Sequence, residues 1–87
     1  MDNQKFIEMA KGLVVNFANS HVDPTDGVVI DVDQVYVVWL CKTLQNNKAL
    51  LGTTLPDGMY YEVTYNGDKN EAYLDAYKKF HNQCIIF

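Results

Sequence analysis

The side chains able to act as nucleophiles or metal ligands are few and far apart in this sequence. The chain has two cysteines, Cys41 and Cys84, and two histidines, His21 and His81. Neither cysteine belongs to a C-x-x-C pair, and no metal-ligand spacing surrounds either of them. Cys41 alternates with Trp39 along an apolar strand, which favours a thiol buried in the core over a nucleophile paired with an imidazole. The spacing therefore predicts no catalytic residue.

A cluster of carboxylates follows the first predicted helix, and a calcium loop is one interpretation of it. The segment lacks the alternating acidic register and the closing glutamate of such a loop, so a solvated acidic loop is preferred. A glycine-rich phosphate loop is also missing from the sequence. We therefore expect a non-enzymatic protein without a metal or cofactor. The clustered residues are Asp23, Asp26, Asp31 and Asp33.

Polar residues surround the turn of a predicted hairpin: Lys42, Asn46, Asn47 and Lys48. Their ammonium and amide groups donate hydrogen bonds, so this tip could bind an anion beside neighbouring aromatic side chains. A solvated turn is the simpler interpretation, because asparagine tolerates the backbone conformations that tight hairpin turns require.

Hydrophobic periodicity predicts the elements that position these residues. Apolar side chains recur every three or four residues over 3–20, which predicts an amphipathic helix. Alternating apolar and β-branched runs predict strands at 35–43, at about 48–55 and at 59–65. Asp68 resembles a helix cap, and helical spacing after it predicts a final helix whose apolar face carries Tyr73, Ala76, Tyr77, Phe80 and Cys84. Residues 28–33 are either a short strand or an irregular lead-in.

These elements predict a single α+β domain over residues 1–87. Its order is α-β-β-β-α, with two helices packed on one face of a three-stranded antiparallel meander in a two-layer sandwich. The first predicted strand is apolar on both faces, and two helices cover one face. We therefore predict an uncovered second face that acts as an interface. Its predicted residues are Tyr36, Val38, Leu40 and Tyr60.

The overall charge restricts the choice of partner. The net charge is −4 and every cationic side chain is a lysine. Duplex nucleic-acid binding depends on cationic side chains, and arginine supplies the fork that reads guanine and grips phosphate, so this composition disfavours it. The sequence contains no signal peptide and no run of apolar residues long enough to span a membrane, so we expect a soluble cytoplasmic protein. The apolar end "CIIF" is expected to dock against the sheet or against a partner.

Several segments together resemble a family of small proteins of unknown function from phages and prophages of Gram-positive bacteria. The matching text is "VYVVW" from Val35, "CKTLQN" from Cys41, "KALL" from Lys48, "DGMYYEVTYNGDK" from Asp57 and "YLDAYKK" from Tyr73. The resemblance brings no activity with it. It implies a phage-borne protein expressed in a bacterial cytoplasm, where small acidic phage proteins often inhibit or redirect host machinery.

Three partner classes follow from these observations. The first is a host protein, or a second copy of the chain, bound through a sheet face. The second is an anionic nucleotide held between tyrosines and the Lys42/Lys48 tip. The third is double-stranded RNA, since α-β-β-β-α is also the order of a double-stranded RNA-binding domain. The predicted last helix starts with Asp68-Lys69-Asn70-Glu71 rather than with a lysine-rich run, and Lys78 and Lys79 lie near its far end, which argues against RNA.

Overall fold

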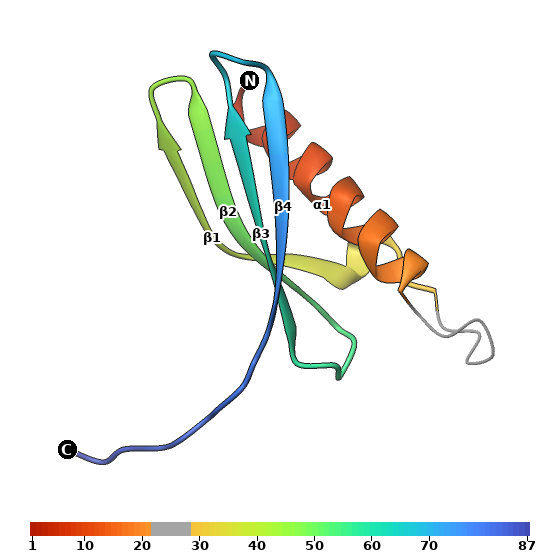
Figure 1. Ribbon diagram of the computed structural model, residues 1–87, viewed down its shortest axis with the longest axis vertical. Coiled ribbons are helices and arrows are strands. Elements are labelled where there is room, and N and C mark those ends of the chain that lie inside the picture. The colour runs from red at the N-terminus through yellow and green to blue at the C-terminus, as the bar shows by residue number, and fades with distance from the viewer. Residues whose placement is uncertain (22–28) are drawn as a thin grey trace.

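The computed structural model describes residues 1–21 and 29–87. Within these residues the chain forms one α-helix, a short 3-10 helix and a four-stranded sheet (Figure 1). In chain order the elements are α1 (Asn3–Ser20), η1 (Val32–Gln34), β1 (Val35–Thr43), β2 (Asn46–Thr53), β3 (Met59–Asn66) and β4 (Glu71–Lys78). No helix in the described part of the chain is both long and apolar enough to cross a membrane.

Helix α1 coincides with the predicted helix over 3–20. Asp2 caps it, because its side chain accepts a hydrogen bond from the Lys5 backbone N–H at 2.8 Å. The buried stripe contains Phe6, Ala10, Val14 and Ala18, spaced by four residues along one face. The small alanines let the helix lie close to the sheet, while the side chains of Phe6 and Val14 fill the space between the helix and the sheet.

The sheet is antiparallel, and its strand order β1-β2-β3-β4 follows the chain. Helix α1 packs against β1, β2 and β3 on one face, and no described segment covers the other face (Figure 1). The core lies between them and includes Ala49, Leu51, Tyr61 and Val63 from β2 and β3. The predicted three-stranded meander with two helices was therefore wrong, and so was the α-β-β-β-α order on which the analogy with RNA-binding domains depended.

Strand β4 replaces the predicted last helix. The segment has the spacing of a helix, yet it also alternates, with Tyr73, Asp75 and Tyr77 on one side and Leu74 and Ala76 on the other. Aromatic side chains favour strands, and Asn70 has a positive φ of 53°, which is incompatible with the first turn of a helix. Asp68 lies in the turn before β4, where it accepts a hydrogen bond from Gln45 instead of capping a helix.

A β-bulge in β1 changes which side chains face the helix. The pairing with β2 shifts between Val37 and Trp39, so Val38 is the extra residue. Past this point the alternation is displaced by one residue. Trp39 and Cys41 therefore lie on the face opposite to α1, and Leu40 packs against the core. The sequence prediction assumed unbroken alternation and assigned these three residues to the wrong faces.

The tips of the two outer hairpins are joined to each other. Gly67 donates its backbone N–H to Asn46 Oδ1 at 3.1 Å, and Gln45 Nε2 donates to Asp68. A Cβ atom at position 67 would lie 2.1 Å from the Gln45 carbonyl oxygen, so glycine is required for this approach. The β1–β2 turn is at Leu44 and Gln45, so Asn46 and Asn47 belong to β2 and not to the turn, and Leu44 adopts the positive φ of 56°.

The acidic segment before β1 is described in part. Asp31 caps η1, because its side chain accepts from the Val32 N–H at 2.6 Å while Gln34 Oε1 accepts from the Asp31 N–H at 2.9 Å. Residues 29–31 form no strand, and η1 follows them, so the lead-in interpretation is correct for the described part of 28–33. Asp23 and Asp26 lie outside the described residues.

Asn47 is a buried polar residue in the apolar layer. It is 1% exposed, and among the described residues neither its Oδ1 nor its Nδ2 has a hydrogen-bond partner. Leucine has a similar shape and no polar group to desolvate. We expect Asn47→Leu to raise the free energy of unfolding by about 1–2 kcal/mol, measured by urea denaturation.

The neighbouring asparagine provides a matched control for that substitution. Asn46 is exposed and its Oδ1 accepts the Gly67 hydrogen bond, so Asn46→Leu should lower the free energy of unfolding. If both substitutions change stability in the same direction, the burial of Asn47 is not the cause.

Candidate functional site

The face of the sheet opposite α1, called here the open face, is the candidate site. Paired residues of neighbouring strands point to the same face, so the register defines its rows of side chains. Three rows cross the sheet from β1 to β4: Tyr36, Gly52, Tyr60 and Tyr77; then Trp39, Leu50, Glu62 and Asp75; then Cys41, Lys48, Thr64 and Tyr73. The open face is thus aromatic at its two edges.

The aromatic side chains of the open face are accessible. Tyr36 is 48% exposed, Trp39 41%, Tyr73 53% and Tyr77 52%. Gly52 leaves room for the Tyr36 ring, because a Cβ atom there would come within 2.6 Å of the ring. Tyr73 donates its hydroxyl hydrogen to Glu71 Oε2 at 2.7 Å, and this bond raises the pKa of Tyr73. Several large side chains therefore present their rings to solvent on one surface.

The charges of the open face are mostly acidic. Lys48 Nζ lies 3.1 Å from Glu62 Oε1, and Asp75 is paired directly across the strands from Glu62. Lys42, the other predicted tip lysine, lies on the helix side and donates to the Met1 carbonyl oxygen at 2.9 Å. The two lysines predicted to bind an anion together are therefore on opposite faces, and the one on the open face is ion-paired.

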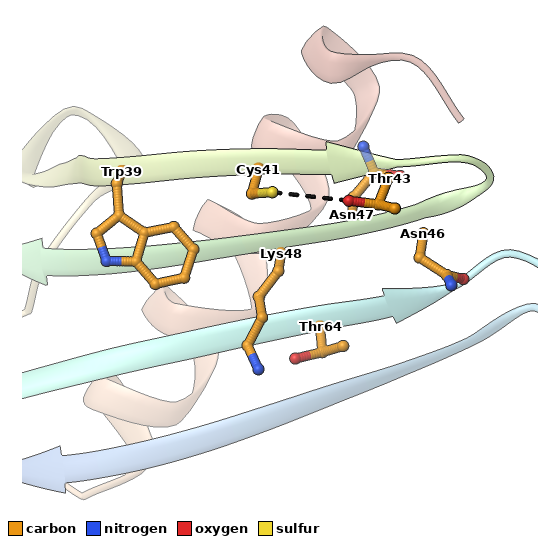
Figure 2. Close-up of a pocket in the computed structure, with 7 residues that line it drawn as sticks. All are labelled: Trp39, Cys41, Thr43, Asn46, Asn47, Lys48 and Thr64. Carbon is orange, nitrogen blue, oxygen red and sulfur yellow. Dashed lines mark hydrogen bonds between the residues drawn. The ribbon is translucent and has the colours of Figure 1, made fainter.

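A shallow hollow of about 430 Å³ lies at the hairpin end of the open face (Figure 2). Trp39 and Lys48 border it, and Cys41 Sγ lies 3.8 Å from Thr43 Oγ1 on its rim. In Figure 2 the indole of Trp39 and the side chain of Thr64 extend over the same surface from different strands. Its walls are largely apolar, which suits an inserted apolar side chain better than a phosphate group.

The structure brings together only part of the predicted interface. Tyr36 and Tyr60 lie in the first row of the open face. Val38 is the bulge residue and is half exposed, whereas Leu40 packs against the core on the helix side. Of the four predicted tip residues, Asn46 binds the neighbouring turn, Asn47 is buried, and Lys42 and Lys48 point to opposite faces.

Sequence reasoning missed three residues of the open face: Trp39, Tyr73 and Tyr77. Trp39 was assigned to the core because the bulge could not be read from the alternation. The two tyrosines were assigned to a helix. The signal available for them was their spacing of four, which places two residues on one side of a strand as well as on one side of a helix.

The cysteines and histidines form no catalytic arrangement in the described residues. Cys41 and Cys84 are both exposed, so the predicted burial of Cys41 was wrong, and the bulge is the cause. His21 stacks on Phe17 with ring centroids 4.0 Å apart, and His81 hydrogen-bonds to Gln83. Within the described ranges no three His, Cys, Asp or Glu side chains are grouped as metal ligands would be.

Comparison with known families gives a match that extends over nearly the whole chain. The model of the family of unknown function DUF6275 matches residues 7–86. The chain belongs to this family. The match includes every strand of the open face and most of α1, so the DUF6275 domain corresponds to the whole helix-and-sheet unit. No curated protein and no solved structure matches the chain.

Proposed function

We propose that this protein acts by binding another protein through its open face and carries out no catalysis. The observation that carries the proposal is the set of half-exposed aromatic side chains, Tyr36, Trp39, Tyr73 and Tyr77, on a sheet whose other face is covered by α1. Tyrosine and tryptophan are the side chains most often found at the energetic centres of protein interfaces. Large apolar patches of this kind are uncommon on isolated proteins.

The proposed partner is a host protein in a bacterial cytoplasm. This part of the proposal depends on the sequence resemblance to phage and prophage proteins, together with the acidic composition of the chain. A phage-borne binding protein of this size would act as an accessory factor that inhibits or redirects host machinery, including a defence system. A basic surface on the partner would complement Glu62, Asp75 and Glu71 at the centre and edge of the open face.

Trp39 provides a direct test because it is the single tryptophan of the chain and lies on the proposed surface. Host proteins captured from a bacterial lysate would be identified, purified and titrated against the protein. Burial of Trp39 should shift its fluorescence emission to shorter wavelengths. Trp39→Ala and Tyr36→Ala should each weaken binding roughly 30-fold, as expected for a large aromatic residue that becomes buried in an interface.

Val32→Ala is the matched control for these substitutions. Val32 is 43% exposed, close to the value for Trp39, but it lies in η1 and not on the sheet. The open face is not the interface if a purified partner binds the Trp39→Ala variant as tightly as the unchanged protein. The alternative function, sequestration of an anionic nucleotide, would be favoured if nucleotides alone shift the Trp39 emission at micromolar concentrations.

A further inference from the structure

Strand β4 forms one edge of the sheet, and the ladder shows which of its backbone groups face outward. The Lys79 N–H donates to the Gly58 carbonyl oxygen at 2.7 Å, one residue beyond the Met59–Lys78 pair, so Gly58 and Lys79 are a hydrogen-bonded pair that continues the β3–β4 ladder. Such pairs alternate along an antiparallel ladder. Residues 71, 73, 75, 77 and 79 therefore bond to β3, and Ala72, Leu74, Ala76 and Lys78 direct their N–H and C=O groups away from it.

The β4 edge lacks two of the usual features that prevent strands from pairing, proline and a β-bulge. Residues 71–78 contain no proline, and their register with β3 is continuous. At the opposite edge, β1 carries the Val38 bulge, which interrupts any further pairing there. After β4 the chain continues away from the domain as an extended segment (Figure 1), in which Phe80 is fully exposed. An additional strand could thus pair with β4 and with this extension.

The charges along β4 identify the strand that fits. Carboxylates occupy its first part, at Glu71 and Asp75, and cations occupy its last position, Lys78, and the next residue, Lys79. A second β4 running antiparallel would place the cationic end of each strand beside the acidic part of the other. We infer that the protein self-associates through β4, which joins two sheets into one continuous antiparallel sheet.

The side chains also define the register of this pairing. With Tyr77 of both copies on the two-fold axis, Asp75 lies directly opposite Lys79 of the second copy, and the same pair recurs on the other side of the axis. The Lys79 ammonium already lies on the open face, 5.9 Å from the Tyr60 ring centroid, so it faces the same side as Asp75. On the helix side, Leu74 is opposite Phe80 of the second copy, which gives that exposed ring an apolar neighbour.

Other symmetric registers are less favourable. A pairing centred on Asp75 places two aspartates opposite each other, and one centred on Tyr73 places Glu71 opposite Asp75. Like charges directly opposite destabilise a strand pair. In a pairing centred on Ala76, Asp75 lies opposite Tyr77 and Lys79 lies opposite Tyr73, so Asp75 and Lys79 are not paired with each other. The register centred on Tyr77 is the one that neutralises both.

The inferred pairing is independent of the proposed function. It uses the backbone edge of β4 and, of the open face, only the side chains at that edge, so Tyr36 and Trp39 on β1 stay exposed in both copies. Loss of self-association with retention of partner binding would therefore separate the two proposals.

Disulfide trapping tests the pairing and its register together. Both cysteines would first be replaced, by Cys41→Ser and Cys84→Ser, because both are exposed. In the inferred dimer, Tyr77→Cys places two thiols opposite each other in a pair without mutual hydrogen bonds, where Cα atoms are about 4.5 Å apart. Oxidation in a glutathione buffer should convert most of this variant to a covalent dimer on a non-reducing gel.

Tyr73→Cys is the matched control. Tyr73 lies on the same strand and face with nearly the same exposure, but it is four residues from the axis and faces His81 of the second copy. After the same oxidation, the Tyr73→Cys variant should form no covalent dimer on the non-reducing gel. The inference is overturned if the two variants cross-link equally, or if neither does. Preferential cross-linking of a Leu74→Cys variant would overturn this register.

Charge reversal provides a second, non-covalent test. Sedimentation of the unchanged protein should show a concentration-dependent dimer. Lys79→Glu should weaken dimerisation roughly tenfold, because it places a second carboxylate opposite Asp75 at both symmetric positions. The double variant Asp75→Lys/Lys79→Glu should restore the dimer. A protein that stays monomeric at high concentration, or a double variant as weak as the single one, contradicts the inference.

Discussion

Phe6→Ala is expected to lower the free energy of unfolding by about 3–5 kcal/mol. The Phe6 side chain is completely buried between α1 and the sheet, together with Val14, Leu51 and Val63. Small domains have net stabilities of only about 5–15 kcal/mol. Because α1 contributes its buried stripe to a thin core on one side of the sheet, little else can compensate for the cavity left by the lost ring.

Urea denaturation monitored by circular dichroism measures this loss. The same substitution at the other end of the chain is its control, because Phe87 is fully exposed and Phe87→Ala should leave the midpoint unchanged. Equal effects of the two substitutions would mean that α1 does not pack on the sheet as described.

A pair of proline substitutions in β4 should have very different effects. The Tyr77 N–H points toward β3, so Tyr77→Pro removes a ladder hydrogen bond and brings the ring against the neighbouring strand. We expect a loss of roughly 2–3 kcal/mol in the free energy of unfolding. The Ala76 N–H points outward, so Ala76→Pro should cost much less in the isolated domain while preventing pairing of β4 with a second copy.

Denaturation midpoints and sedimentation distinguish these outcomes. If residues 71–78 formed a helix, both prolines would lie in its interior and would destabilise the protein by similar amounts. Similar losses at the two positions would therefore contradict the strand. A much larger loss at Tyr77 than at Ala76 is specific to an edge strand in this register.

The elements that could be predicted from the sequence are those whose apolar side chains follow one periodicity, either helical or alternating. Residues 3–20 repeat every three or four positions and residues 59–65 alternate, and both were located to within one residue. The segment after Asp68 fits both periods, because Tyr73 and Tyr77 are four apart and Leu74 and Ala76 are two apart. Its local signals are therefore ambiguous, and its conformation is determined by pairing with β3, which is a tertiary contact.

The candidate site was predictable in kind but not in composition. An uncovered sheet face with Tyr36 and Tyr60 could be predicted, because the first strand is apolar on both faces and the predicted helices cover only one of them. The bulge at Val38 could not be seen, because one inserted residue leaves the apolar run of β1 unbroken. For that reason the sequence prediction assigned Leu40 to the open face and Trp39 to the core, which is the reverse of their positions in the structure. Because residues 71–78 form β4 and not the predicted second helix, Tyr73 and Tyr77 are exposed on this face as well.

The sequential strand order has a consequence for how the chain folds. Each strand pairs with its neighbour along the chain, and the turns joining them are short, so closing each hairpin costs little entropy. Helix α1 instead packs against β1, β2 and β3, so its contacts join residues that are far apart in the sequence. If the hairpins form first, both faces of the meander are briefly exposed to solvent. During synthesis at high levels, this intermediate is the species most prone to aggregate.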